Sequence, residues 1–401
     1  MSFRYIELFA GIGGFRTALD QLGGECVFAS EIDKFATQSY RALYNGASEL
    51  HGDITQIDAK DIPNHDVLVG GFPCQAFSVA GQRKGFEDTR GTLFFEIARI
   101  AKEKQPRLML LENVKGLLSH DQGRTFETMC VALNEIGYAV DFRVLNSKYF
   151  GVPQNRERIF IVCDRDAANE SCVIEGNNVV SKAKRRAQEL GIRTFSFNWP
   201  TESEVSLRLR DILEKCVSEK YYLSEERASK LISELEKRRE FTPVEDEKDI
   251  VYAGLLGEGF RQINEVLDID GVCTALRTFQ GGGLHPKIAE PQILQRARGN
   301  NSGGLHTIAP TITKNAYEQN NHLVTAELGA FPRYRIRKLT PLECWRLQGF
   351  SDEQHAIAVA AGISDSQRYK QAGNAVTVNV IRAIGERMVA RLALSEAYSV
   401  K

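Results

Sequence analysis

The stretch Phe9-Ala10-Gly11-Ile12-Gly13-Gly14-Phe15 stands between a β-prone run at residues 4–10 and a helical pattern at residues 14–22. Glycines at a strand-to-helix turn let the backbone turn tightly and let a ligand lie against the N–H groups at the start of the helix. The stretch therefore predicts a nucleotide-type ligand site in an α/β fold, with a purely structural turn as the alternative. Because the spacing is not G-x-G-x-x-G, it does not favour a nicotinamide-dependent dehydrogenase.

Short β-prone runs and helical patterns alternate through residues 1–165. Such alternation is typical of consecutive βα units, in which helices flank a parallel sheet. The predicted strands cover residues 4–10, 26–30, 67–70, 108–111 and 158–163. The predicted helices cover residues 14–22, 34–43, 92–103 and 125–136.

From about residue 190 the pattern changes. A charged helical stretch at residues 224–240 is followed by glycine-rich, weakly periodic segments, which predicts a second domain or a large insertion. Helical periodicity resumes at residues 341–348 and 378–392, and we expect this tail to rejoin the first domain.

Length and composition are those of a globular protein with more than one core. The chain has 401 residues, of which 43% are hydrophobic and 26% are charged, and this length exceeds one typical domain. It has no apolar run long enough to span a membrane and no signal-peptide layout, so we expect a cytoplasmic protein with no membrane partner. The eight cysteines show no metal-ligand spacing, so we expect free thiols and no metal.

The net charge of −1 argues weakly against a nucleic-acid partner, but the charges are unevenly spread. Residues 276–340 hold three glutamates against nine basic residues, namely Arg277, Lys287, Arg296, Arg298, Lys314, Arg333, Arg335, Arg337 and Lys338. This excess predicts a local basic surface, with solvated charges on unrelated faces as the alternative.

Candidate functional side chains stand where the predicted strands end. Glu31 ends the second strand, Cys74 follows the third within Gly70–Gln75, and Glu112 ends the fourth. The carboxyl ends of neighbouring parallel strands meet at one edge of an open α/β sheet, which is where ligands bind. A lone cysteine is more often a small buried hydrophobe. The arrival of these groups at the edge that also carries the glycine-rich turn nevertheless favours a functional site.

Five motifs follow one another along the chain: Phe9–Phe15, Phe72–Gln75, Glu112–Val114, Gln154–Arg158 and Gln371–Val376. Together they resemble the bacterial DNA (cytosine-5)-methyltransferases, especially the HhaI-type modification enzymes, over nearly the whole chain. The resemblance implies an α/β fold with a doubly wound, Rossmann-like methyltransferase domain and a smaller, mostly irregular or β target-recognition domain. The implied parts are a catalytic domain at 1–190, a recognition domain at 191–330 and a segment completing the catalytic domain at 331–401.

The resemblance also implies a covalent mechanism. Cytosine C5 is too weak a nucleophile to take a methyl group unaided, so a thiolate first adds to C6, and Cys74 would supply that thiolate. Glu112 would hydrogen-bond N3 and N4 of the base, and Arg158 would bind O2, with Arg156 as a further catalytic candidate.

S-adenosylmethionine is the implied cofactor. Its predicted site comprises Phe9, Gly11, Gly13, Gly14, Glu31, Ile32, Asp53, Ile54, Pro73, Leu93, Asn374 and Ala375. Two residues depart from the pattern of the family. Ile32 stands where relatives can carry an aromatic that stacks on adenine, and Glu7 stands where aspartate is frequent.

Double-stranded DNA with a short specific site is the implied partner, and the target base must be flipped out of the helix to be reached. A polar loop at residues 78–90 is expected to cover the base, while segments 257–262 and 277–283 are expected to read the sequence. The predicted DNA-binding residues are Gln75, Ser78, Arg83, Lys84, Arg261, Gln262, Arg277 and Gln280.

Two rival functions stay open at this point. Methylation of tRNA is one, because a subfamily of this architecture acts on RNA, although the long segment at 191–330 favours DNA. A non-catalytic DNA-binding protein is the other, although Cys74, Glu112 and Arg158 are all present. We further expect a monomer, with a separately acting restriction endonuclease as a candidate companion.

Overall fold

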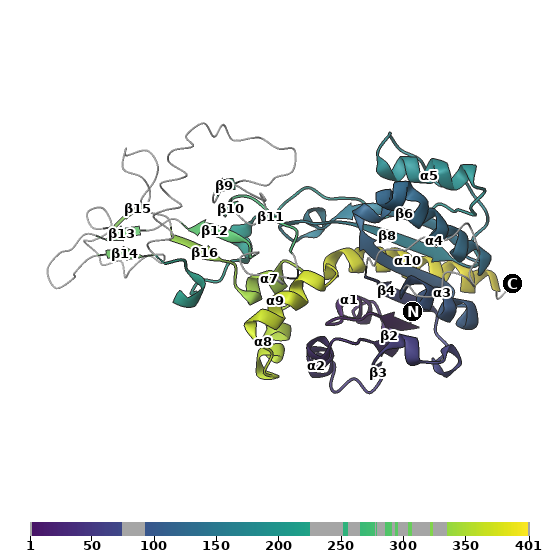
Figure 1. Cartoon of the computed structure of the whole chain (residues 1–401), viewed down its shortest axis with the longest axis horizontal. Coiled ribbons are helices and arrows are strands. Elements are labelled where there is room, and N and C mark those ends of the chain that lie inside the picture. Colours follow the sequence, from purple (N-terminus) through teal and green to yellow (C-terminus); the bar gives the residue numbers. More distant parts are fainter. Residues whose placement is uncertain are drawn as a thin grey trace.

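The computed structural model describes residues 2–73, 93–224 and 335–399, and between the last two ranges also 252–255, 265–276, 278, 285–290, 293–295, 304–306 and 321–323. The loop predicted at residues 78–90 and nearly all of the helix predicted at residues 224–240 lie outside these ranges. The described residues form a large α/β body with a smaller β-rich part extending to one side (Figure 1).

A seven-stranded sheet forms the centre of the large body, in the order β3-β2-β1-β4-β5-β8-β6. Five of its strands run parallel, namely β1 (Phe3–Leu8), β2 (Gly24–Ser30), β3 (Leu50–His51), β4 (Val67–Gly71) and β5 (Leu108–Val114). The chain runs outward from β1 to β3 and then returns to β4 on the other side of β1. The direction of winding therefore reverses between β1 and β4, where an open α/β sheet has its ligand crevice.

The sheet is mixed, which differs from the predicted parallel sheet. Strand β8 (Glu157–Asp164) is antiparallel to both β5 and β6 (Ala139–Asn146). Strand β6 was absent from the prediction because Asp141 interrupts its apolar run. The buried Asp141 carboxylate is satisfied by Lys184 at 2.7 Å and by the Trp199 indole N–H at 2.8 Å. A buried charge with partners of this kind is tolerated inside a strand.

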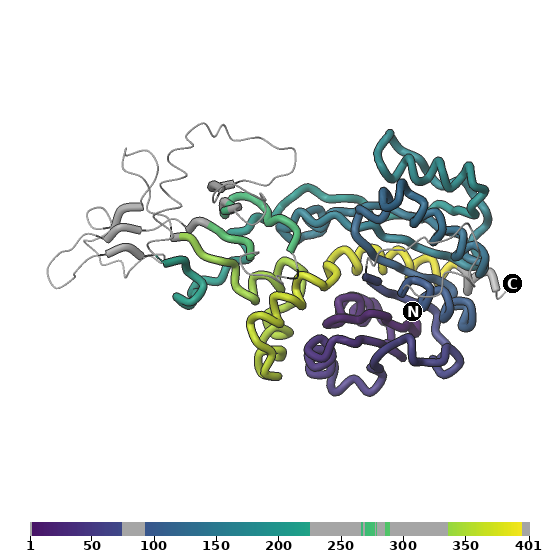
Figure 2. The backbone as a smooth tube through the Cα atoms, in the orientation of Figure 1, coloured from purple at the N-terminus to yellow at the C-terminus, as the bar shows by residue number. Residues whose placement is uncertain are grey.

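Helices cover both faces of the sheet, as the alternating pattern predicts. One face packs against α1 (Gly14–Asp20) and α10 (Val378–Ser399), and the other packs against α3 (Leu93–Lys104) and α4 (Arg124–Glu135). Successive residues of β4 alternate between these two cores, since Val67 and Val69 belong to the first and Leu68 to the second. The tube in Figure 2 shows that α10, near the C-terminus, runs beside the N-terminal half of the chain.

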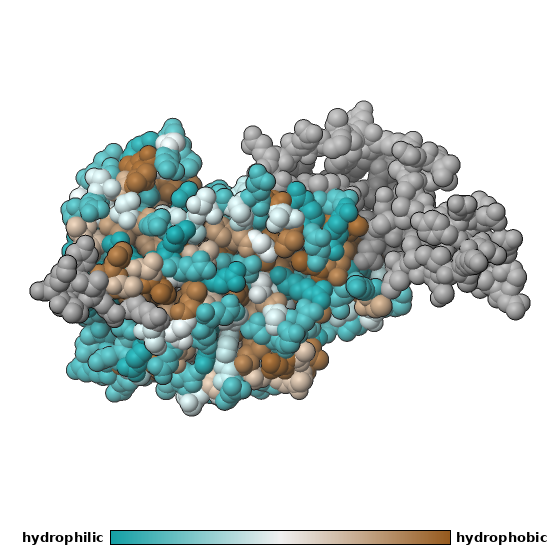
Figure 3. All heavy atoms as spheres, turned by 180° about the vertical axis from the view of Figure 1, so that it is seen from behind, coloured by the Kyte–Doolittle hydropathy of each residue, from teal (hydrophilic) through white to brown (hydrophobic). Residues whose placement is uncertain are grey.

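The remaining helices of this body are α2 (Lys34–Leu43), α5 (Val179–Glu189), α7 (Pro341–Arg346), α8 (Asp352–Ala360) and α9 (Asp365–Asn374). Short 3-10 helices include η1 (Ile54–Gln56), η2 (Ala59–Asp61), η3 (Lys115–Gly123), η4 (Ser147–Phe150), η5 (Leu209–Ile212) and η6 (Glu219–Tyr221). Within the described ranges, no helix is long and apolar enough to cross a membrane. The face drawn in Figure 3 mixes hydrophilic surface with apolar patches.

The smaller part is built from short strands. A four-stranded sheet has the order β16 (Arg335–Lys338), β12 (Lys287–Glu290), β10 (Glu265–Asp268) and β9 (Tyr252–Leu255). A three-stranded sheet has the order β14 (Gly304–His306), β13 (Ile293–Gln295) and β15 (Asn321–Leu323). One further pairing joins the two parts, because β11 (Cys273–Thr274) runs parallel to β7 (Gln154–Asn155).

The prediction of a basic surface at residues 276–340 is wrong for two of its nine basic residues. Arg337 is fully buried, and its guanidinium makes a two-pronged ion pair with Glu343 at 2.7 and 2.8 Å. Lys287 is also buried, with 7% of its surface exposed. A charge run in the sequence does not distinguish a solvated cation from one that ties β16 to α7 through a carboxylate. Arg277, Arg296, Arg298, Lys314 and Arg333 lie outside the described residues.

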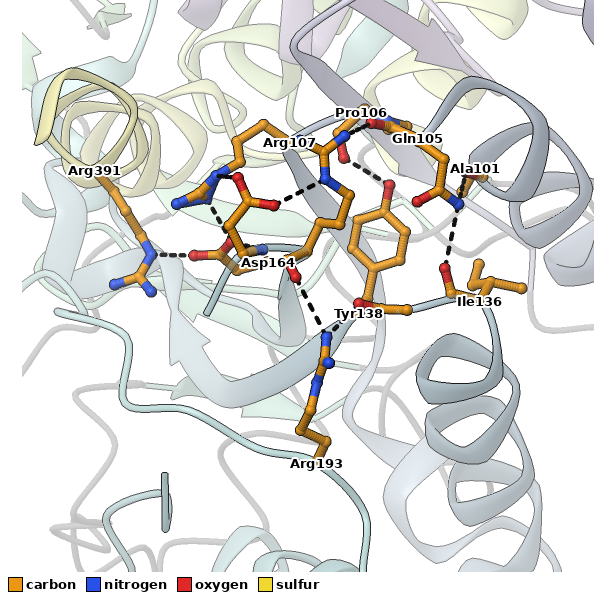
Figure 4. A network of polar contacts seen from close by, with 12 residues as sticks. Ala101, Gln105, Pro106, Arg107, Ile136, Tyr138, Asp164, Arg193 and Arg391 are labelled. Atoms are coloured by element: carbon orange, nitrogen blue, oxygen red, sulfur yellow. Dashed lines mark hydrogen bonds and ion pairs between the residues drawn. The ribbon is translucent and has the colours of Figure 1, made fainter. Parts of the chain in front are cut away.

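At the edge of the sheet where β8 ends, Asp164 joins three segments of the chain (Figure 4). Its fully buried carboxylate accepts from Arg107 before β5 and from Arg391 of α10, each at 2.5 Å. The Arg391 guanidinium also lies over the Phe195 ring, 4.7 Å from its centroid. These contacts hold α10 against the end of the sheet where β5 begins, which is opposite the carboxyl end of β5.

We predict that Asp164→Asn lowers the free energy of unfolding by roughly 3–5 kcal/mol, because two partly buried guanidinium groups lose their buried counter-charge. Urea unfolding monitored by circular dichroism measures the change. Asp352→Asn is the matched control, since it breaks the exposed Arg346–Asp352 pair and should cost no more than about 1 kcal/mol. Equal losses for the two variants would contradict the prediction.

Candidate active site and cofactor pocket

The turn between β1 and α1 has the left-handed backbone that its glycines allow. Phe9, Gly11 and Gly13 have φ values of 57°, 57° and 82°. A Cβ on Gly11 would meet nothing within 4 Å, so open space lies beside this residue. A Cβ on Gly13 would lie 2.5 Å from the Tyr44 ring, and one on Gly14 would lie 2.6 Å from Val376. The first glycine therefore borders space for a ligand, whereas the other two are required by close packing.

Glu31 holds this turn against the end of β2. One carboxylate oxygen accepts from the Gly11 N–H and the other from the Asp33 N–H, both at 2.7 Å. Burial raises the pKa of Glu31, and these two N–H bonds oppose the rise. Next to it, Ile32 is 74% exposed, which is unusual for a large apolar side chain and leaves its surface available to a ligand.

The third part of the predicted cofactor site comes from η1. Asp53 caps this helix, with one carboxylate oxygen accepting from the Thr55 N–H at 3.0 Å and from the Thr55 hydroxyl at 2.8 Å. Ile54 is buried, and its carbonyl accepts from Arg99 at 3.1 Å. The cap fixes Asp53 beside the carboxyl ends of the strands, and the Ile54 side chain is a core residue.

Glu7 lies in β1, two residues before the start of the glycine turn at Phe9, and is fully buried. One of its oxygens accepts from the Tyr40 hydroxyl at 3.0 Å, while the other has no hydrogen-bond partner among the described residues. Burial is the largest influence and raises the pKa of Glu7 to about 8, and the Tyr40 hydrogen bond and the Arg16 charge oppose it. Glu7, which stands where the family often has aspartate, thus places a carboxyl that favours its neutral form inside the core.

Glu112 and Arg158 form the buried ion pair of the site. Arg158 Nε lies 3.1 Å from Glu112 Oε1, and Glu112 has 8% of its surface exposed. Because β8 runs antiparallel to β5, the start of β8 lies at the carboxyl end of β5, where Val114 faces Arg158. Burial is the largest influence and raises the pKa of Glu112, against the neighbouring positive charges of Arg158 and Arg156.

Asn113 is a positioning residue that the sequence did not single out. Its side-chain amide donates to the Phe72 carbonyl at 2.9 Å and is buried. This bond ties the end of β5 to the segment that leads from β4 to Pro73, the last described residue before Cys74. The signal was present in the Glu112–Val114 motif, but a lone amide does not reveal its partner.

Arg156 makes contacts that differ in kind from those of Arg158. Its buried guanidinium donates to three main-chain carbonyls, those of Leu276 at 3.1 Å, Gly373 at 3.3 Å and Ala375 at 3.1 Å. Burial, reinforced by Arg158, lowers the pKa of Arg156 to about 9. These bonds give Arg156 the geometry of a positioning residue, which holds the backbone on both sides of Asn374, a role that the sequence did not indicate.

Gln154, two residues earlier, also bonds to the main chain of Leu276. Its amide oxygen accepts from the Leu276 N–H at 3.0 Å, and its amide nitrogen donates to the Leu347 carbonyl at 2.7 Å. Both peptide groups of Leu276 are therefore held by the loop before β8. Asn374 itself is exposed at the end of α9, while Ala375 is buried.

Several predicted site residues are not placed. Cys74, Gln75, Ser78, Arg83, Lys84, Arg261, Gln262, Arg277 and Gln280 lie outside the described residues. Leu93, the first residue of α3, resumes the description after the gap and is half-buried. The part of the chain that the structure does describe has no cluster of three or more His, Cys, Asp or Glu side chains that could hold a metal ion.

Known proteins resemble this chain along nearly its whole length. The model of the C-5 cytosine-specific DNA methylase family matches residues 3–390. Orphan methyltransferase M.SPRI of Bacillus phage SPR is 40% identical over 432 residues, spanning 96% of this chain and 97% of the relative. Type II methyltransferase M.HhaI of Haemophilus parahaemolyticus is 36% identical over 381 residues, spanning 95% and 92%.

Solved structures support the fold. The crystal structure of S. pombe Dnmt2 methyltransferase matches with a TM-score of 0.61 at 19% identity, covering 97% of this chain and 99% of that chain.

The doubly wound sheet and the matching family model define an S-adenosylmethionine-dependent methyltransferase. The chain belongs to the C-5 cytosine-specific DNA methylase family and is a DNA (cytosine-5)-methyltransferase. The family favours DNA over tRNA as the substrate and sets aside the dehydrogenase and the non-catalytic protein.

We predict that Glu7→Gln removes a pH-dependent part of the stability. Because burial raises the pKa of Glu7 from 4.5 to about 8, the folded protein keeps a proton that the unfolded chain releases above pH 4.5. The resulting stability is fully present below pH 4.5 and is lost as the pH rises through 8. Between pH 5 and 8 the wild-type free energy of unfolding should therefore fall by roughly 3–4 kcal/mol more than that of the variant.

Urea unfolding at a series of pH values measures this difference. Glu25→Gln removes an exposed carboxylate from the neighbouring strand β2 and controls for the change in net charge. If Glu7→Gln and the wild type lose stability in parallel across this range, Glu7 does not carry the effect.

Proposed function

We propose that this enzyme methylates C5 of one cytosine within a short specific site of double-stranded DNA, with Cys74 as the nucleophile and Glu112 and Arg158 as the groups that bind the flipped base. The observation that carries the proposal is the Glu112–Arg158 pair, whose atoms are 3.1 Å apart at the sheet edge that leads to Cys74. A carboxyl and a guanidinium at one place match the N3, N4 and O2 edge of cytosine.

The raised pKa of Glu112 suits this role. Burial shifts Glu112 toward its protonated form, and a protonated carboxyl could share its proton with N3 of the base while the Cys74 thiolate adds to C6. Arg158 then faces the negative charge that would collect on O2. In the same addition, the electron pair of the C5–C6 bond moves to C5, which becomes nucleophilic.

When bound, S-adenosylmethionine would provide the electrophilic methyl group that this C5 takes up. Its proposed holders are Phe9, Gly11, Gly13, Gly14, Glu31, Ile32, Asp53, Ile54, Pro73, Leu93, Asn374 and Ala375. Open space beside Gly11 and the exposed Ile32 side chain fit such a ligand. Once C5 carries the methyl group, loss of the C5 proton to a base or water and breakage of the C6–sulfur bond restore aromaticity and release Cys74.

Three parts of the chain would share the work. Residues 1–190 and 331–401 would form the catalytic domain, and residues 191–330 would read the DNA. The shared core of α1 and α10 supports the union of the first two ranges. We further propose a metal-free, monomeric, cytoplasmic enzyme that meets DNA at the nucleoid. Orphan phage and type II enzymes are both among its relatives, so a restriction endonuclease is a candidate companion.

We predict a covalent complex with duplex DNA that carries 5-fluorocytosine at the target position. Fluorine cannot leave C5 as a cation, so the step that releases Cys74 is blocked after methyl transfer. Denaturing electrophoresis should show the complex only when S-adenosylmethionine is present. Peptide mass spectrometry should then find the nucleotide on Cys74.

Two variants serve as controls for this experiment. Cys74→Ser should form no complex, whereas Cys216→Ser, which alters an exposed cysteine, should form as much as the wild type. Attachment of the nucleotide to any other cysteine would overturn the assignment of the nucleophile.

We predict that replacing Arg277 and Gln280 by Ala relaxes sequence recognition without altering affinity for S-adenosylmethionine. A lost base contact should cost about 1–3 kcal/mol, or roughly 5- to 150-fold in discrimination. Methylation of the cognate site and of its single-base variants, compared at several salt concentrations, measures the effect. Uniform weakening with a smaller salt dependence would mean phosphate contacts instead, and wild-type behaviour on every substrate would exclude both residues as readers.

A further inference from the structure

Tyr44, the residue that follows α2 and caps its C-terminus, lies against the glycine-rich turn of the proposed cofactor site. Its hydroxyl donates to the Gly13 carbonyl at 2.7 Å. The same oxygen is 2.7 Å from the Thr17 hydroxyl. Thr17 in turn accepts from the Gln354 side-chain amide of α8 at 3.0 Å. If each donor is counted once, the bonds run in one direction, from Gln354 through Thr17 and Tyr44 to Gly13.

The Tyr44 ring has little freedom to move away from this turn. Its atoms occupy the space that a Cβ on Gly13 would need, at 2.5 Å. The Arg16 guanidinium lies over the ring, 4.3 Å from its centroid, and the Tyr40 ring packs at 4.7 Å on a tilted plane. Burial accordingly raises the pKa of the Tyr44 hydroxyl, which keeps it a hydrogen-bond donor.

The turn is thus held from two sides. Glu31 fixes one end by accepting from the Gly11 N–H at 2.7 Å, and Tyr44 fixes the other end at the Gly13 carbonyl. That carbonyl already accepts the first helical bond of α1, from the Thr17 N–H at 2.9 Å. The hydroxyl of Tyr44 is therefore not needed to satisfy the carbonyl, and its bond adds an orientation that the helix alone does not impose.

We propose that Tyr44 is a positioning residue for S-adenosylmethionine, which sets the orientation of residues 11–13 toward the cofactor through the Gly13 carbonyl. The proposal rests on the cofactor site proposed above. Because binding of a ligand to a preformed backbone costs less ordering than binding to a loose one, loss of the hydroxyl should weaken cofactor affinity more than any other property.

Tyr44→Phe tests this, because it removes the hydroxyl and keeps the ring that fills the space beside Gly13. The dissociation constant of S-adenosylmethionine, measured by calorimetric titration, and its KM should each rise roughly 3- to 10-fold, which is the effect of one hydrogen bond. The kcat at saturating cofactor and the KM for DNA should match the wild type. Thr17→Val removes the hydroxyl that donates to Tyr44 and should raise the dissociation constant of S-adenosylmethionine by a smaller factor.

Tyr138→Phe is the matched control, since it deletes a buried tyrosine hydroxyl that donates to the Pro106 carbonyl at 2.6 Å. It should lower Tm at least as much as Tyr44→Phe and leave cofactor affinity unchanged. Wild-type affinity in Tyr44→Phe, or parallel losses of Tm, kcat and affinity in the two variants, would overturn the proposal. Failure of the wild type itself to bind S-adenosylmethionine would overturn the cofactor site, and the role of Tyr44 with it.

Discussion

A buried guanidinium joins the three segments on which the site depends. Arg156 precedes β8, yet it donates to carbonyls of Leu276, Gly373 and Ala375, which lie 120 to 219 residues further along the chain. Main-chain carbonyls cannot neutralise a charge, so burial costs free energy and lowers the pKa of Arg156 to about 9. The structure tolerates this cost at the point where Arg156 holds the segment of Leu276, the turn around Asn374 and the start of β8 together.

The antiparallel strand β8 explains how one sheet edge collects both members of the Glu112–Arg158 pair. A parallel strand would have delivered Arg158 to the opposite edge, because its first residue would lie where β5 begins. Since β8 reverses direction, its start coincides with the end of β5. Glu112 is buried in this pair, where desolvation raises the pKa of its carboxyl and the Arg158 guanidinium opposes the rise.

The alternation of apolar runs was sufficient to predict five strands, four helices and the glycine turn, because those segments follow simple periodicity. It missed β6, where Asp141 is compensated by Lys184 and Trp199 from distant segments. Sequence also placed Glu31 and Glu112 at one edge. It could not reveal that Arg156 bonds to backbone or that Arg337 is buried against Glu343, since tertiary partners decide both.

The shared core of α1 and α10 has a consequence for biosynthesis. Phe15 and Leu19 leave the ribosome long before Ile381 and Ile384, which belong to the same core. At roughly 5–20 residues per second, synthesis of the intervening chain takes on the order of 20–70 seconds. During that interval one face of the sheet has no covering helix from the tail. A nascent chain of this enzyme therefore presents an apolar surface that chaperones can bind, and a truncated product would keep that surface exposed.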